Sequence, residues 1–320
     1  MTSSAPFCLG NEAVLLADLH RHLDGSLRPA TVVELAARKG LPVPADLPFF
    51  AGMGLDAALS RFAFTLSLLQ EPAAVRRVAA EMCEDAAAEG VSTLEIRFAP
   101  QLHHGASVEV IVDAALEGIN SRAGLILCGL YGEPPQVLER LVDVATSRPG
   151  VVGIDLAGGP TTGQSFGMLD YAPAYRRAEE LGIGRTVHAG EGRPPEEIRI
   201  AIEHLRAQRI GHGTTLLTAP AVVELVCKSG VTLEACPTSN VHTGVVSELA
   251  EHPLARWLAL GVPACVCADN TLLSAVDAPE EHRRALTITG MDESLLRRSI
   301  AYGHAAAFKR QGFARRALTS

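Results

Sequence analysis

The chain has 320 residues, of which 48% are hydrophobic and 20% charged, and this composition predicts a folded protein with a large core rather than a disordered one. Its 28 Lys and Arg against 36 Asp and Glu give a formal net charge of −8. Acidic and basic residues are interspersed, which argues against a nucleic-acid groove or a polybasic membrane anchor.

The N-terminal residues lack a basic segment followed by an apolar one, so they predict no secretory signal. No apolar run is long enough to cross a bilayer. The seven cysteines show no zinc-ribbon spacing, and several lie within apolar runs. We therefore expect buried, reduced thiols in a cytoplasmic protein, and a metal role for the pair Cys265 and Cys267 is disfavoured.

The first predicted element is a buried strand, an apolar run from Val14 to Leu19 that leads into His20-Arg21-His22. Side chains alternate along an extended chain, so His20 and His22 project to the same side. Two converging imidazoles make half of a site for zinc or a similar transition metal. Because a His-x-His pair is common by chance, this stretch alone leaves a metal site undecided.

The next segment is a long excursion before the second strand. A helix is predicted from Pro29, at its first turn, to Gly40, which ends it. Residues 41–53 are rich in Pro, Gly and Phe and predict irregular structure, whereas 55–69 predict an apolar helix. The 41–69 segment is a candidate lid over a site; a helical hairpin packed on the surface explains it equally well.

From Pro72 onward, strands and helices alternate regularly. The predicted strands number eight with the first, and a closed (β/α)8 barrel of the TIM type is the expected α/β architecture. An open doubly wound sheet is the alternative, although it usually has a Gly-rich first turn. No linker divides the chain, so we expect a single domain over residues 1–320. The later strands are predicted at 93–98, 125–130, 151–156, 185–188, 209–212, 231–235 and 263–268.

Polar side chains collect where these predicted strands end, which is where the active site of such a barrel lies. His20 and His22 end the first strand, His188 the fifth and His212 the sixth, and Asp269 follows the eighth. Each alone is explained by a hydrogen-bonded residue at a strand terminus. Together they predict one metal site, in which three histidines and an aspartate leave a position for water.

A carboxyl group completes this constellation. A bound cation lowers the pKa of its water toward neutrality, and a second group must then protonate the molecule under attack. Glu191, three residues after His188, is predicted to do so with a pKa raised by burial; a carboxylate favoured by a helix dipole is the alternative. For the other histidines we expect surface or supporting positions, namely His103, His104, His204, His242, His252, His282 and His304.

Four segments carry a family resemblance: 20–26 (HRHLDGS), 186–191 (TVHAGE), 209–214 (RIGHGT) and 236–240 (CPTSN). In order and spacing, across nearly the whole chain, they resemble the motifs of the adenosine deaminase family of the amidohydrolase superfamily. The resemblance implies hydrolytic deamination of a 6-aminopurine nucleoside at C6, with release of ammonia. It also implies one Zn²⁺, or a similar divalent metal, held by the side chains of His20, His22, His188 and Asp269.

The same resemblance implies roles for single residues. Glu191 would donate a proton to ring N1, His212 would orient and stabilise the hydroxide, and Asp269 would accept its proton. The backbone of Gly158 would contact N3, and Asp24 would face the sugar. A small purine nucleoside is the only partner implied, and the sequence does not predict the number of subunits.

Two departures from the family pattern concern the substrate. Asn270 follows the metal aspartate where the family usually has a second aspartate, and it would offer its amide N–H to purine N7. The turn at 157–160 (AGGP) replaces a more usual Gly-Asp-Glu. Similar bacterial sequences with this Asn include deaminases of 6-aminodeoxyfutalosine, a nucleoside of menaquinone synthesis with a carboxyphenyl ketone at its 5′ end.

That substrate carries a carboxylate, for which Arg61 in the candidate lid is the first predicted partner and Arg97 the second; for Arg97 a salt bridge within the barrel is favoured. Deamination of adenosine or adenine is the alternative within the same chemistry. A metal hydrolase of cyclic amides is disfavoured, because it needs no ring-nitrogen proton donor such as Glu191. An inactive nucleoside-binding protein is the non-enzymatic alternative.

Overall fold

A ring of eight parallel strands positions the predicted metal ligands. The computed structural model describes residues 7–159 and 163–308, and its strands pair in chain order from first to last. A parallel bridge between Arg21 and Asp269 joins the last segment to the first. The barrel strands are β3 Leu16–His22, β4 Val91–Phe98, β5 Gly124–Leu130, β6 Val151–Ala157, β7 Gly184–Ala189, β8 Arg209–His212, β9 Thr232–Ala235 and β10 Ala264–Val266.

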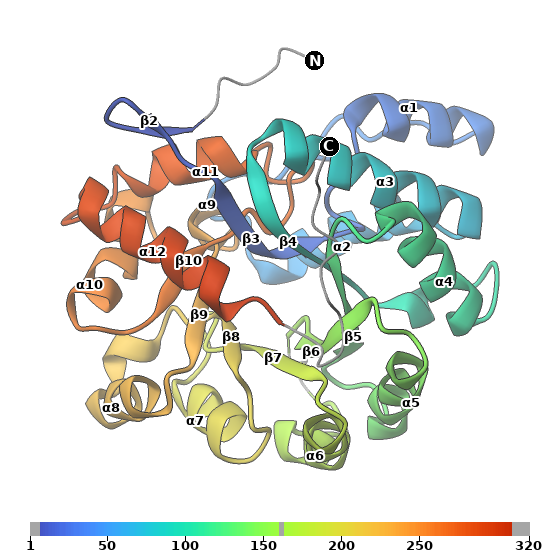
Figure 1. Cartoon of the computed structure of the whole chain (residues 1–320). Helices are drawn as coiled ribbons and strands as arrows, with labels where there is room; N and C mark the ends of the chain where they lie inside the picture. The colour runs from blue at the N-terminus through green and yellow to red at the C-terminus, as the bar shows by residue number, and fades with distance from the viewer. Residues whose placement is uncertain (1–6, 160–162, 309–320) are drawn as a thin grey trace.

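Helices surround these strands on the outside (Figure 1). Several begin with proline in the first turn, where the missing N–H costs no hydrogen bond. The predicted (β/α)8 barrel of the TIM type is thereby confirmed. The surrounding helices are α3 Pro72–Ala88, α4 Val108–Ile119, α5 Pro135–Thr146, α6 Ala172–Glu180, α7 Glu196–Glu203, α8 Pro220–Ser229, α10 Leu254–Ala259 and α12 Glu293–Ala306, with short 3₁₀ turns at Pro100–Leu102, Met168–Tyr171, Leu216–Thr218 and Leu249–Glu251.

Some elements lie outside the sequence prediction. An antiparallel hairpin of β1 (Cys8–Leu9) and β2 (Glu12–Ala13) precedes the barrel, and three helices follow the strand ends late in the chain. Two of those helices have clear start signals, since the side chain of Asp277 accepts from the Glu280 N–H and that of Asp292 from the Leu295 N–H. The three helices are α9 Pro237–His242, α11 Ala278–Ala285 and α12.

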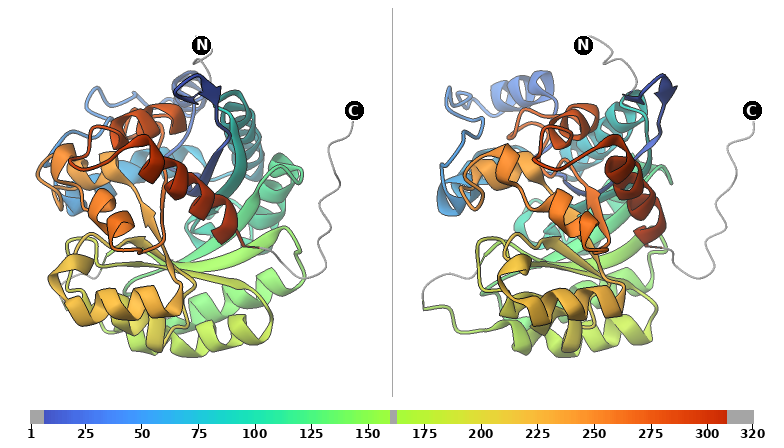
Figure 2. Two further views of the ribbon diagram at one scale, coloured as in Figure 1. Left: turned by 60° about the vertical axis from the view of Figure 1, so that its left-hand side comes forward. Right: turned by 90° about the vertical axis from the view of Figure 1, so that its left-hand side faces the viewer.

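The 41–69 segment lies at the end of the barrel where the strands finish. It follows α1 (Pro29–Arg38) and contains α2 (Leu55–Leu68). The Phe62 ring in α2 packs at 6.2 Å from the ring of His22, and the Phe49 N–H donates to the Leu273 carbonyl at 2.6 Å. In the right-hand view of Figure 2, this blue segment and the end of the red α12 lie at opposite ends of the barrel. Whether the segment moves as a lid stays a prediction.

The interior of the barrel holds charged side chains, whereas branched apolar residues usually fill such barrels. Glu95, Arg97, Asp155, Arg209 and Glu234 are all at most 2% exposed. Buried charges are tolerated only when paired, and here three carboxylates face two guanidinium groups. With all five ionised, one negative charge is left over, which favours a cation nearby.

Two further features of the fold concern its helices and its cysteines. Over residues 7–159 and 163–308, every helix is too short or too polar to pass through a lipid bilayer. Five cysteines are buried and carry free thiols, whereas Cys8 and Cys227 are exposed. The buried ones are Cys83, Cys128, Cys236, Cys265 and Cys267.

Candidate active site

Closure of the barrel brings the predicted metal ligands together. The Asp269 N–H donates to the His20 carbonyl and the His22 N–H donates to the Asp269 carbonyl, both at 2.8 Å. As a result, Asp269 Oδ1 lies 3.6 Å from His20 Nε2 and 3.5 Å from His22 Nε2, and the two Nε2 atoms are 3.2 Å apart. Ligands about 2.1 Å from a tetrahedral ion lie roughly 3.4 Å from one another. The observed separations fit that arrangement.

The third histidine comes from the end of β7. The ligand atoms of His20, His22 and His188 all lie within 4.8 Å of one another, although the last is far away in the sequence. Burial lowers the pKa of His20 and of His22 well below the usual range. Both imidazoles are therefore neutral, which is the form that binds metals.

Carboxylates orient two of these rings from behind. His20 Nδ1 lies 2.7 Å from Glu234 Oε2, and His188 Nδ1 lies 3.0 Å from Asp155 Oδ2. A proton on each Nδ1 is thereby directed to a carboxylate, so that Nε2 is free to face the shared centre. Arg97 contacts both carboxylates, at 2.7 Å and 2.9 Å. Arg97 is wholly buried in this network and does not reach the mouth of the barrel.

The residues present fit a divalent metal. Asp269 Oδ1 is buried and has no hydrogen-bond partner, although a buried carboxylate oxygen normally has one. The backbone of Asp269 has φ 60° and that of His212 has φ 65°, in the left-handed region that costs most residues free energy. Such strain concentrates at functional sites, and here it aims two side chains into the centre.

Glu191 lies beside the same centre. It is 4% exposed, and burial raises its carboxyl pKa above the usual range. Its Oε1 accepts from the Thr243 hydroxyl at 3.5 Å and is 3.8 Å from His212 Nδ1. A carboxyl group whose pKa is raised in this way is better suited to act as a general acid.

The structure places two further side chains behind His212. The Asn240 amide donates to His212 Nδ1 at 3.0 Å, and the His252 ring donates to the Asn240 Oδ1 at 3.1 Å. Burial lowers the pKa of His212 to about 3. A neutral ring whose Nδ1 accepts from Asn240 carries its proton on Nε2. It can donate that proton as a hydrogen bond.

The comparisons with known proteins decide the family. A protein-family sequence model described as adenosine deaminase matches residues 16–318. The chain belongs to the adenosine deaminase family. It is 33% identical to an adenosine deaminase of Serratia proteamaculans over 314 residues, which cover 92% of this chain and 93% of that protein.

Solved deaminases share the fold of this family member. It resembles an adenine deaminase from Arthrobacter aurescens with a TM-score of 0.84 and 25% identity, covering 92% of this chain and 94% of that one. An N6-mAMP deaminase of Arabidopsis gives a TM-score of 0.83 and 26% identity, with 93% and 94% covered. The chain is thus an enzyme of the hydrolytic deaminase type.

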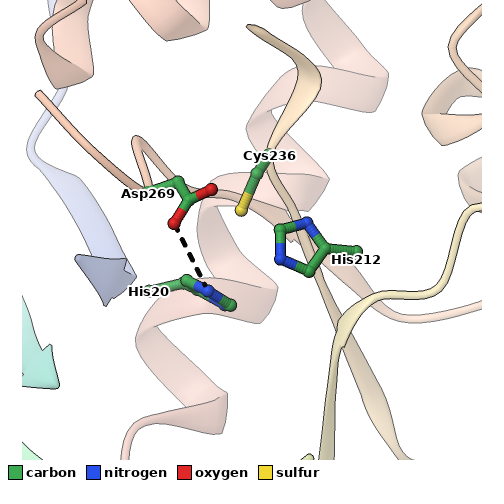
Figure 3. Close-up of side chains that lie close together, drawn as sticks. All are labelled: His20, His212, Cys236 and Asp269. Atoms are coloured by element: carbon green, nitrogen blue, oxygen red, sulfur yellow. Dashed lines mark ion pairs between the residues drawn. The ribbon is translucent and has the colours of Figure 1, made fainter. Parts of the chain in front are cut away.

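A second set of possible ligands overlaps the first in this adenosine deaminase family member. His20, His212, Cys236 and Asp269 have ligand atoms within 4.8 Å of one another, and Figure 3 shows the Cys236 sulfur pointing toward the same space. Burial raises the pKa of the Cys236 thiol well above its usual range. A coordinating metal ion deprotonates a thiol, so this pKa does not distinguish the two sets. The separations among His20, His22 and Asp269 fit a tetrahedral ion, and the histidine and aspartate set is favoured for that reason.

Three residues predicted to contact the substrate, Asp24, Gly158 and Asn270, lie just after the ends of barrel strands. Asp24 Oδ1 and Asn270 Oδ1 are both buried without a hydrogen-bond partner, and burial raises the pKa of Asp24 to about 6. Gly25 makes room for Asn270, because a Cβ there would lie 2.1 Å from its Oδ1. Gly158 has φ 73°, which favours glycine, and a Cβ there would meet open space. Pro160 of the same turn lies outside the described residues.

Arg61 lies on α2, outside the buried centre. Its Nη2 is 3.1 Å from Asp46 Oδ2, and its Nη1 donates to the Pro48 carbonyl at 3.3 Å. The Asp46 side chain is 80% exposed, so the carboxylate with which an incoming anion competes for Arg61 is a solvated one. Binding of the substrate carboxylate by Arg61 stays a prediction.

Proposed function

We propose that the chain is a zinc aminohydrolase that replaces the 6-amino group of a purine nucleoside and releases ammonia, with 6-aminodeoxyfutalosine as preferred substrate. The observation that carries the chemistry is Glu191, a buried carboxyl with a raised pKa beside His212 and the four metal ligands. Hydrolysis of a simple amide needs no proton donor to a ring nitrogen. We place this activity in the cytoplasm, where buried free thiols persist.

The residues divide the proton transfers among them. A divalent metal, when bound, supplies a Lewis acid that makes hydroxide available near neutral pH. Attack at C6 breaks the aromaticity of the ring, and protonation of N1 by Glu191 relieves this most strongly in the transition state. Asp269 accepts the proton of the attacking water and passes it to the 6-amino group as the C6–N bond breaks, so that ammonia leaves. The proton of the new C6 hydroxyl returns to Glu191 and leaves a C6 carbonyl. His212, held by Asn240, donates a hydrogen bond to the attacking oxygen.

The purine is held by groups that stand around this centre. The Gly158 backbone contacts N3, the Asn270 amide contacts N7, and Asp24 faces the sugar. The unpartnered Oδ1 of Asp24 supports its placement toward the sugar hydroxyls, because a buried acceptor without a partner in the free protein is suited to bind a donor on a ligand. The 5′ end of the nucleoside then extends toward the 41–69 segment and Arg61.

Adenosine or adenine is the second candidate substrate, and the identity to an adenosine deaminase over nearly the full chain favours it. A panel of 6-aminodeoxyfutalosine, adenosine and adenine, followed by loss of aminopurine absorbance, distinguishes these choices. We expect kcat/KM for 6-aminodeoxyfutalosine to exceed that for adenosine by at least about 100-fold. Comparable values would refute the substrate choice, and no turnover together with no bound metal would leave a nucleoside-binding protein.

Substitution of Arg61 tests the contact with the substrate carboxylate. Arg61→Ala is expected to raise KM for 6-aminodeoxyfutalosine about tenfold, as for loss of one charge-assisted hydrogen bond, and to leave adenosine unchanged. Asp46→Asn is the matched variant, because it removes the competing carboxylate and should lower the same KM. Equal effects of Arg61→Ala on both nucleosides would remove Arg61 from this role.

A further inference from the structure

The last residue of α12 and the two residues after it, 306–308, lie at the end of the barrel opposite the active site, and we call them the plug. The Phe308 ring occupies a notch made by Gly153 and Gly184, register partners on β6 and β7. A Cβ on Gly184 would lie 2.2 Å from the ring, and one on Gly153 would lie 2.7 Å away. The two glycines are therefore needed to admit the ring. Figure 1 shows the end of α12 running toward the ring of strands.

The plug contacts both members of a buried ion pair. The Arg209 guanidinium carbon lies 3.6 Å from the centre of the Phe308 ring, and Arg209 Nη1 donates to the Ala306 carbonyl at 3.0 Å. The Phe308 N–H donates to Glu95 Oε1 at 2.6 Å, while Glu95 Oε2 pairs with Arg209 Nη2 at 2.5 Å. The ring, the carbonyl and the carboxylate together fix the plane of the guanidinium.

The carboxylate of Glu234 connects Arg209 to the active site. Arg209 Nε lies 2.7 Å from Glu234 Oε1, and Glu234 Oε2 lies 2.7 Å from His20 Nδ1. Thr186 donates to the same Oε1 at 3.0 Å. One oxygen of Glu234 thus faces the plug and the other faces the predicted metal ligand. A continuous line of contacts runs through Phe308, Arg209, Glu234 and His20.

We propose that the plug is a positioning element for His20, and that its aromatic ring sets how tightly the protein binds its metal; this rests on the proposed metal at His20. The ring excludes water from Arg209, and exclusion of water strengthens the attraction between Arg209 and Glu234. Glu234 is then held in the orientation that directs His20 Nε2 to the centre. Partners of this kind typically change metal affinity 10–100-fold.

The test is zinc affinity, measured by competition with a chelator, beside the thermal midpoint of the metal-free protein. Phe308→Leu fills the notch but removes the aromatic face, and we expect zinc to bind about tenfold more weakly. Phe308→Tyr keeps the face and should bind as the unmodified protein does. Leu258→Ala, a buried change in α10, lowers the thermal midpoint and should leave zinc affinity unchanged.

A double substitution shows whether the effect passes through Glu234. In a Glu234→Gln background, Phe308→Leu should weaken zinc binding no further, because groups acting in one chain are not additive. If Phe308→Leu lowers the thermal midpoint but not zinc affinity, or if the two losses add, the proposal is overturned. If the unmodified protein binds no zinc, the proposed function is overturned and this inference with it. Measuring the unmodified protein beside the variants distinguishes that outcome from a failure of this inference alone.

Discussion

Replacing Glu191 with glutamine should lower kcat for deamination by about 10²–10⁴-fold with little change in KM. The amide has nearly the size of the carboxyl and can still accept from the Thr243 hydroxyl, so ground-state binding is retained. It has no acidic proton to deliver to N1 as the ring loses aromaticity. The substitution therefore destabilises the transition state and leaves substrate binding almost unchanged. Steady-state kinetics on the preferred nucleoside measure both constants.

Glu196→Gln is the matched control for this substitution. Glu196 begins α7, a few residues beyond Glu191, and its side chain is 53% exposed and paired with Arg199. The same chemical change there should leave kcat and KM unaltered. A kcat for Glu191→Gln within tenfold of the unmodified enzyme would show that another group protonates the substrate.

Replacing Asp269 with asparagine should abolish most of the activity, with kcat reduced by about 10⁴-fold, and should weaken metal binding by at least 10–100-fold. The change removes a ligand charge and the proton acceptor together. Asparagine tolerates a left-handed backbone well, and Asp269 has φ 60°. The thermal midpoint of the metal-free protein should therefore change little in Asp269→Asn, whereas Asp269→Ala should lower it.

Cys236→Ser separates the two overlapping sets of ligands. Cys236 belongs only to the set that also contains His212, so its substitution should leave metal content and kcat close to those of the unmodified enzyme. A loss of metal in Cys236→Ser comparable to that in Asp269→Asn would mean that the ion occupies the other set. Elemental analysis of the two variants, purified side by side, measures this.

The ends of the strands could be predicted because they are marked by local sequence patterns. Apolar runs mark the strands, and polar residues that interrupt them at one end, such as His188 and His212, mark the mouth of the barrel. The barrel topology then requires these residues to converge. The backbone bridge between Arg21 and Asp269 adds a detail that no local pattern contains, since it depends on closure of the whole ring.

The salt bridge of Arg97 within the barrel was predicted and is confirmed, but the other buried charges were missed for the same reason. Asp155 and Glu234 lie within strands that otherwise predict apolar cores, and a charged residue there was a signal that something pairs with it. Their partners, Arg97 and Arg209, lie on other strands, so the pairing cannot be read from spacing. The support that His252 gives to His212 through Asn240 is equally a product of the folded chain.

Crystals of the zinc-loaded protein, measured at the zinc absorption edge, test most directly whether one ion joins these distant residues. We predict a single anomalous peak within bonding distance of His20, His22 and His188 Nε2 and of Asp269 Oδ1. A peak bound instead by Cys236 and His212, or no peak at the end of β3 in protein that deaminates purines, would contradict the account.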